Sequence, residues 1–190
     1  LLAIAVFGII FVIVMVVITS QIPSYEIVDE DLQSNIHFDT LMDITASEYE
    51  VSDEVGDISD LRFMVNLKTL NIPDASNITD YSVLYNMPSI ENLTIRNAEE
   101  LEDIGFLSSL VNLQYLNIEG SRIDDLSILE DNLSITELVL ENNEELSDYT
   151  FLDNLPSLKK LKLTTTQGAL IPDFSQHKFL TDINVNGETK

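Results

Sequence analysis

The stretch LQYLNIEGSRIDDLSILEDNLSITELVL, residues 113–140, decides the fold, because LQYLNI (113–118) returns in it as ITELVL (135–140). Both hexapeptides have the form Leu-x-x-Leu-x-Leu with Ile allowed, and alternating apolar residues predict a strand with one buried face. The pattern occurs six times, with first members 23, 23, 22, 23 and 22 residues apart. The copies are Leu67/Leu70/Ile72, Ile90/Leu93/Ile95, Leu113/Leu116/Ile118, Ile135/Leu138/Leu140, Leu158/Leu161/Leu163 and Leu180/Ile183/Val185. This period predicts a solenoid with one short parallel strand in each repeat.

A second motif keeps the same period, an aspartate followed two residues later by Ser, Gly or Thr. Its members are Asp57, Asp80, Asp103, Asp125, Asp148 and Asp173. We expect each carboxylate to accept a backbone N–H bond and to cap a turn or short helix on the convex side. The apolar residues expected to point from these turns into the core are Leu61, Leu84, Leu107, Leu129 and Leu152.

Over residues 57–185, the Asp-x-Ser turn and the period of about 22 residues resemble the internalin-like bacterial class of leucine-rich repeats. The resemblance implies an α/β solenoid of short parallel strands with convex turns or short helices. The chain departs from the usual pattern three positions after the last strand residue, where an Asn is common. The residues there are Ala75, Ala98, Ser121, Asn143 and Thr166. Since only Asn143 keeps the amide, we expect most loop hydrogen bonds to be made by other groups.

Composition excludes several classes of function. The 190 residues include 9 Lys+Arg against 33 Asp+Glu, a net charge of −24, and no cysteine. Such a polyanion repels nucleic acid, and without cysteine there is no disulfide, thiolate nucleophile, iron–sulfur cluster or Cys-type zinc site. The two histidines, His37 and His177, lie far apart in the repeat order, and the sequence has no Gly-x-Ser-x-Gly, His-Glu-x-x-His or phosphate-binding loop. We therefore expect a non-enzymatic protein without cofactor or metal.

The first 18 residues, LLAIAVFGIIFVIVMVVI, contain no polar side chain. A helix of this length spans ~27 Å, close to the hydrocarbon thickness of a bilayer. Because it has no polar face, we expect it to lie in a membrane or among other proteins. The residues expected to pack this helix against its neighbours are Leu1, Ala5, Gly8, Phe11 and Met15. Acidic residues follow it and the first basic residue is Arg62, which places the rest of the chain outside the cell.

This segment resembles the N-terminus of mature type IV pilin-like subunits. It opens on Leu1 without a basic segment, and Pro23-Ser24-Tyr25 follows the apolar stretch. The resemblance implies a hydrophobic helix bundled in the core of an extracellular filament. Ala5 stands where bacterial pilins carry Glu, a residue that archaeal pilins and archaellins commonly lack. The alternative is a single-pass membrane anchor.

The expected domain organisation has three parts: a hydrophobic helix at 1–22, a connector and N-terminal cap at 23–56, and about six leucine-rich repeats at 57–190. Within the cap, Leu32, Ile36, Leu41 and Ile44 could line one helical face. Leu41-x-x-Ile44-x-Ala46 also fits a degenerate first strand. The C-terminal sheet edge shows no dedicated cap, so it either pairs with another subunit or is covered by the short tail.

The candidate protein-binding residues lie on the solvent side of the sheet, the concave face. Lys159, Lys160 and Lys162 alternate with leucines and place three of nine basic residues together. They are interpreted either as a contact for an acidic patch or as ordinary exposed strand lysines. Tyr115 lies on the same face and could anchor a ligand.

Other features have two interpretations each. Acidic runs such as 99–103 fit a solvated surface or a calcium site, although none has EF-hand spacing. Asn77, Asn92 and Asn132 begin glycosylation sequons, which are either chance matches or, on an archaeal surface filament, sites that carry glycans.

Two functions follow from the sequence. In the first, the chain is a structural protein, a subunit of a pilin-like surface filament that displays a leucine-rich repeat domain. In the second, it is a membrane-anchored extracellular binding protein or an accessory subunit of a membrane complex. The expected partners are other copies of the chain or membrane proteins at the N-terminal helix, the lipid bilayer before assembly, and a protein ligand on the concave face.

Overall fold

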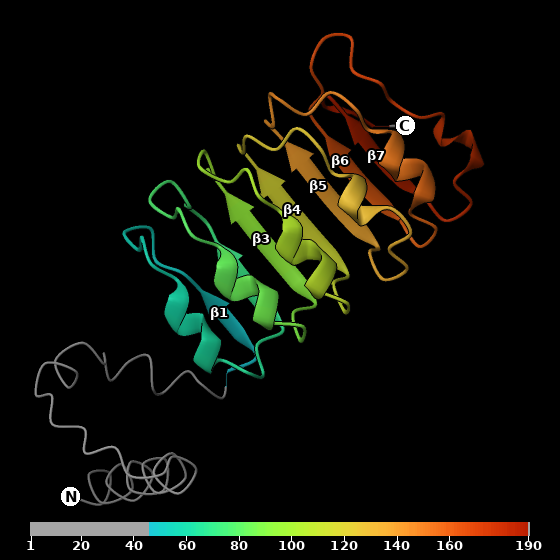
Figure 1. Cartoon of the computed structure of the whole chain (residues 1–190). Coiled ribbons are helices and arrows are strands. Elements are labelled where there is room, and N and C mark those ends of the chain that lie inside the picture. The colour runs from blue at the N-terminus through green and yellow to red at the C-terminus, as the bar shows by residue number, and fades with distance from the viewer. Residues whose placement is uncertain (1–45, 190) are drawn as a thin grey trace, which may run out of the picture. The chain divides into compact units, whose positions relative to one another are not determined.

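The structure is a computed structural model that describes residues 46–189. These residues form one eight-stranded sheet whose strands lie in chain order, with short 3₁₀ helices on the opposite side (Figure 1). The strands are β1 (Glu48–Glu50), β2 (Thr69–Ile72), β3 (Asn92–Arg96), β4 (Tyr115–Glu119), β5 (Glu137–Glu141), β6 (Lys160–Leu163), β7 (Asp182–Val185) and β8 (Glu188–Thr189). The 3₁₀ helices are η1 (Ser59–Phe63), η2 (Ser82–Asn86), η3 (Gly105–Ser109), η4 (Ser127–Leu129), η5 (Thr150–Asn154) and η6 (Phe174–Gln176). This architecture confirms the predicted leucine-rich repeat solenoid.

The core is built from the alternating apolar residues of the strands. Strands β1 to β7 pair in parallel, and equivalent leucines are direct partners from one strand to the next. The leucines of the central row are at most 2% exposed: Leu70, Leu93, Leu116, Leu138 and Leu161. In the last repeat Leu180, Ile183 and Val185 are only half-buried, because no further repeat covers them within the described residues.

The recurring aspartates cap the convex turns as predicted. In all six, Oδ1 accepts the backbone N–H of the residue two positions later, at 2.7–3.0 Å. The leucines expected below these turns are all buried: Leu61, Leu84, Leu107, Leu129 and Leu152. Four of the aspartates, Asp57, Asp80, Asp148 and Asp173, have a lowered pKa because they accept hydrogen bonds from the backbone and side chain two residues on. They are structural groups that hold the turn.

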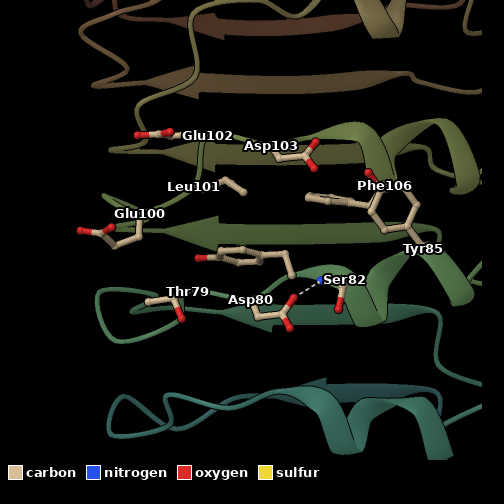
Figure 2. A pocket seen from close by; sticks show the side chains of 10 residues that line it. Thr79, Asp80, Ser82, Tyr85, Glu100, Leu101, Glu102, Asp103 and Phe106 are labelled. Carbon is tan, nitrogen blue, oxygen red and sulfur yellow. Dashed lines mark hydrogen bonds between the residues drawn. The ribbon is translucent and has the colours of Figure 1, made fainter.

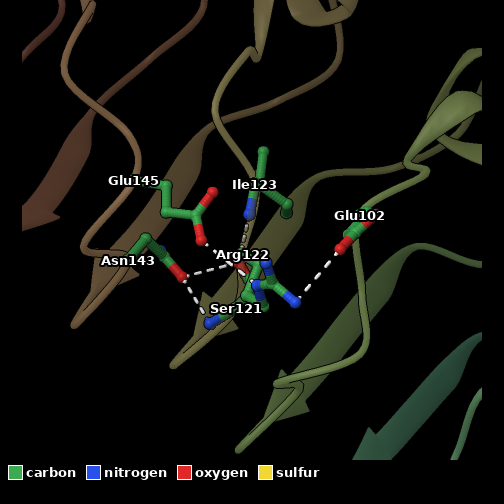
Figure 3. A network of polar contacts seen from close by, with 6 residues as sticks. All are labelled: Glu102, Ser121, Arg122, Ile123, Asn143 and Glu145. Atoms are coloured by element: carbon green, nitrogen blue, oxygen red, sulfur yellow. Dashed lines mark hydrogen bonds and ion pairs between the residues drawn. The ribbon is translucent and has the colours of Figure 1, made fainter.

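Among the described residues the amide ladder is reduced to Asn143, and a second set of side-chain bonds joins the repeats elsewhere. Asn143 is buried and accepts bonds from the backbone N and the Oγ of Ser121, at 2.9 and 2.7 Å, while its Nδ2 donates to the Ile118 carbonyl at 2.9 Å. Figure 3 shows this network beside Arg122, which pairs with Glu145 and Glu102 at 3.1 and 3.3 Å.

At the other end of the strands, side chains of one repeat donate to a backbone carbonyl of the preceding repeat. The donors are Ser89, Asn112, Ser134 and Ser157, at 2.7–3.4 Å. Each stands directly before the first apolar residue of its strand motif, so the signal was present in the sequence although the prediction did not use it. These bonds join neighbouring loops on the edge of the solenoid where the amide ladder does not run.

The first described strand differs from the degenerate strand expected at residues 41–46. Glu48–Glu50 pairs with β2, with Tyr49 opposite Leu70, and Val51 is 2% exposed. The repeat motif is therefore carried by Ala46, Tyr49 and Val51, within the segment that the sequence assigns to connector and cap. Residues 32, 36, 41 and 44 lie outside the described range.

At the C-terminal edge the short tail covers part of the last parallel strand, which corresponds to the second of the two expected arrangements. β8 pairs antiparallel with β7 through a two-residue turn, Asn186-Gly187. Both turn residues have positive φ, 54° and 83°, as Asn-Gly hairpin turns require. The Asn186 side chain also accepts the backbone N–H of Thr165 at 2.8 Å, which ties the turn to the preceding repeat.

Candidate functional site

The concave face consists of the strand residues that point away from the core. Two rows of these residues cross the parallel strands in register. The first row is Glu48, Thr69, Asn92, Tyr115, Glu137, Lys160 and Asp182, and the second is Glu50, Asn71, Thr94, Asn117, Val139, Lys162 and Asn184. The structure therefore brings Tyr115 and Lys160 into one row, separated by Glu137.

Two of the three predicted lysines are paired with glutamates of the neighbouring strand. Lys160 Nζ lies 2.7 Å from Glu137 Oε1, and Lys162 Nζ lies 2.7 Å from Glu141 Oε2. These hydrogen bonds and charges raise the pKa of both lysines. Their side chains remain about half exposed, so solvent and salt screen each pair and its contribution to stability is small. Lys159 precedes the strand and is exposed.

The concave face also carries a buried amide that sequence reasoning missed. Asn117 is 3% exposed, and its Oδ1 has no hydrogen-bond partner among residues 46–189. Its position between Leu116 and Ile118 gave the face on which it lies, but not its burial. A buried carbonyl oxygen without a donor costs stability, so Asn117 is a functional candidate beside Tyr115.

Basic residues are concentrated at the sheet. Five of the nine basic residues lie in the strands or directly before them: Lys68, Arg96, Lys159, Lys160 and Lys162. Lys68 pairs with Glu91 at 2.7 Å and Arg96 with Glu119 at 3.5 Å. The concave face is therefore a mixed-charge surface on a chain whose net charge is −24.

The remaining sequence candidates occupy separate places. Asn77 is exposed, Asn92 donates to Thr69 Oγ1 at 3.2 Å, and Asn132 accepts two backbone N–H groups. His177 lies 3.4 Å from Asp153 in the last convex turn. Within residues 46–189 there is no group of three or more His, Asp or Glu side chains arranged to hold a metal ion.

The N-terminal candidates fall outside the described residues, namely Leu1, Ala5, Gly8, Phe11, Met15 and His37. Among residues 46–189, the helices are all too short or too polar to cross a bilayer.

Comparison with known proteins supports the fold. No family model and no curated protein matches the chain. Among solved structures it is similar to an internalin (InlF) from Listeria monocytogenes, with a TM-score of 0.61, 29% identity, and coverage of 73% of this chain and 42% of that one. It is also similar to internalin C2 from the same organism, with a TM-score of 0.53, 24% identity, and coverage of 69% and 57%.

This chain thus spans about half the length of these internalins. The resemblance predicted from the Asp-x-Ser turns is confirmed at the level of the fold, a leucine-rich repeat solenoid.

Proposed function

We propose that the chain is a non-enzymatic, extracellular protein-binding module that uses the concave face of its solenoid. The observation that carries this proposal is the concentration of basic residues at the sheet. A chain with net charge −24 places five of its nine basic residues in or beside the strands. Similarity to internalins supports a role in protein interaction.

The centre of the proposed surface is Tyr115 with the neighbouring Asn117, Glu137 and Lys160. Tyr115 is partly buried and offers a ring and a hydroxyl, the combination common at interface hot spots. The inter-strand ion pairs hold Lys160 and Lys162 beside glutamates, so this surface offers a partner positive and negative groups side by side. The Oδ1 of Asn117 offers an acceptor for a donor from the partner.

Site-specific photocrosslinking tests this proposal. A benzophenone side chain replaces Tyr115 in the full-length chain, and a matched variant carries it at Leu133, which is 72% exposed on the lateral edge. We expect a discrete crosslinked protein only from position 115. The crosslinked protein is then identified and purified, and its affinity for the wild-type chain is compared with its affinity for two variants. Tyr115→Ala and Lys160→Glu should each weaken this affinity at least tenfold. Equal crosslinking from both positions, or unchanged affinity in both variants, would refute the concave face as the binding surface.

We further propose that residues 1–22 hold this module at the cell surface, as the core of a pilin-like filament or, alternatively, as a membrane anchor. The uninterrupted apolar sequence of residues 1–18 supports attachment, and its resemblance to pilin N-termini favours the filament. Electron microscopy of material sheared from intact cells, with N-terminal sequencing, distinguishes the two. Filaments whose subunit begins at Leu1 support the first arrangement, and protein retained in the detergent-extracted membrane fraction supports the second.

A further inference from the structure

The repeat pattern is broken at Gly105. Every other capping aspartate is followed two residues later by Ser or Thr, whereas Asp103 is followed by this glycine. A Cβ atom at Gly105 would lie 2.2 Å from the hydroxyl of Tyr85 and 3.1 Å from Asp103 Oδ1. The glycine therefore leaves room for the Tyr85 side chain on the convex side.

A cavity of about 280 Å³ adjoins this glycine, between the turns that carry η2 and η3 (Figure 2). Three aromatic rings line it. Tyr81 stacks on Phe106 with ring centroids 6.4 Å apart, and Tyr85 meets Phe106 edge-on at the same centroid distance. Figure 2 shows Tyr85 and Phe106 at one end and the carboxylates of Glu100 and Glu102 at the other.

The charged groups of the cavity are all acidic. Asp80, Asp103, Glu100 and Glu102 line it, and none of the described residues in its wall is basic. The backbone N–H groups of Ser82 and Gly105 hold the two aspartates at 2.8 Å. Glu102 is shared with Arg122, which lies outside the cavity wall at 3.3 Å.

One polar atom of the wall lacks a partner. Tyr81 is 6% exposed, and its hydroxyl makes no hydrogen bond to any residue between 46 and 189. Tyr149 occupies the same position in a later repeat, and its hydroxyl donates to backbone carbonyls. The motif therefore does not require an unpaired hydroxyl, and the one at Tyr81 is a property of this cavity.

We propose that this cavity binds one basic side chain, an arginine or lysine, of a protein partner. The carboxylates complement the charge, and the aromatic rings add cation–π attraction. The hydroxyl oxygen of Tyr81 accepts one N–H of the bound group. The volume lies just below the roughly 300–1,000 Å³ of small-molecule sites, which suits a single side chain. The site is separate from the concave face and does not depend on the function proposed for that face.

Peptide titration followed by NMR tests the proposal. The full-length chain in detergent micelles is titrated with the peptide Ac-Gly-Arg-Gly-NH₂, and with Ac-Gly-Gln-Gly-NH₂ as the neutral control. We expect saturable shifts at the amides of Ser82 and Gly105 with the arginine peptide only, weakening as salt is raised. No saturable shift at tens of millimolar peptide, or equal binding of both peptides, would overturn the proposal.

Three variants locate the site. Gly105→Ser restores the residue of the other repeats and displaces Tyr85, and it should weaken binding at least tenfold. Tyr81→Phe should weaken it severalfold, whereas the matched Tyr149→Phe should bind as the wild type does. Wild-type affinity in both cavity variants would place the site elsewhere. The concave-face variant Tyr115→Ala should leave the titration unchanged, so the two proposals fail or succeed separately.

Discussion

Tyr81 and Tyr149 stand at the same position of two repeats, one residue after the capping aspartate, and their hydroxyl groups have different surroundings. The hydroxyl of Tyr149 lies 3.2 Å from the Thr164 carbonyl and 3.4 Å from that of Leu146. The hydroxyl of Tyr81 has no such partner in the described part of the chain. The repeat motif fixes where the ring is buried, while the adjacent loops decide whether its polar end is satisfied. A solenoid can therefore create a specific site without changing its framework.

Substitutions of the buried leucines that the two repeats share should lower stability most. Leu84 and Leu152, four residues after their aspartates, are both 0% exposed. Leu84→Ala and Leu152→Ala should each lower the free energy of unfolding by about 2–5 kcal/mol, because each leaves a cavity in the core. Urea denaturation of the full-length chain measures both. A loss below about 1 kcal/mol in either variant would show that this repeat relaxes around the cavity.

Removing the tyrosine hydroxyl should lower stability in one repeat and not in the other. Tyr149→Phe leaves two backbone carbonyls without their donor and should lower the free energy of unfolding by about 1 kcal/mol. Tyr81→Phe removes a hydroxyl without a partner and should leave stability unchanged or slightly higher. The same denaturation experiment compares them. Equal losses in both variants would mean that the Tyr81 hydroxyl is satisfied in solution.

The two tyrosines should also differ in how they make stability depend on alkaline pH. Burial raises the pKa of Tyr81 from 10.0 to about 12, and also raises that of Tyr149. The folded state keeps these protons while the unfolded state loses them, so stability should fall as pH rises from about 10 to 12. Tyr81→Phe should reduce this fall more than Tyr149→Phe does. Denaturation at a series of pH values measures the slopes, and an unchanged slope in Tyr81→Phe would contradict the raised pKa.

Replacing the capping aspartates should change stability least, and by the same amount in the two repeats. The pKa of Asp80 is lowered chiefly by the backbone N–H of Ser82, and that of Asp148 chiefly by the hydroxyl of Thr150. A lowered pKa stabilises the fold above the unfolded value of 3.8, and this contribution disappears as pH falls through the folded value.

Asp80→Asn and Asp148→Asn keep an oxygen acceptor and remove the charge. Each should melt slightly below the wild type at pH 6 and close to it at pH 3. Thermal melting at both pH values is the measurement, and a larger deficit at pH 3 than at pH 6 would reverse the assigned sign.

The regular part of the fold was predictable because it depends on local periodicity. Leu116 and Leu138 occupy equivalent places in motifs 22 residues apart, and their burial follows from the alternation. The strand β1 was not predicted at residues 48–50, because Tyr49 stands where other repeats carry Leu or Ile. β8 was not predicted, since a two-residue strand has no periodicity, although Asn186-Gly187 is a hairpin-turn signal.

The sites were predictable only in part. The pairing of Lys160 with Glu137 follows from the period, because the residues are 23 positions apart on neighbouring strands, yet the prediction considered the lysines alone. Gly105 is visible in the sequence as the break in the Asp-x-Ser series. The unpaired hydroxyl of Tyr81 could not be predicted, because it depends on atomic distances between two loops.

The antiparallel β8 has a consequence for how such a chain can lengthen. It occupies the free edge of β7 in the direction opposite to every other strand pair, so a new parallel repeat cannot be added there without displacing it. A duplication of 22 or 23 residues between β2 and β6 finds matching neighbours on both sides. Growth by internal duplication would preserve both ends of the described solenoid, and each added unit would extend the concave face by about one strand spacing, ~4.8 Å.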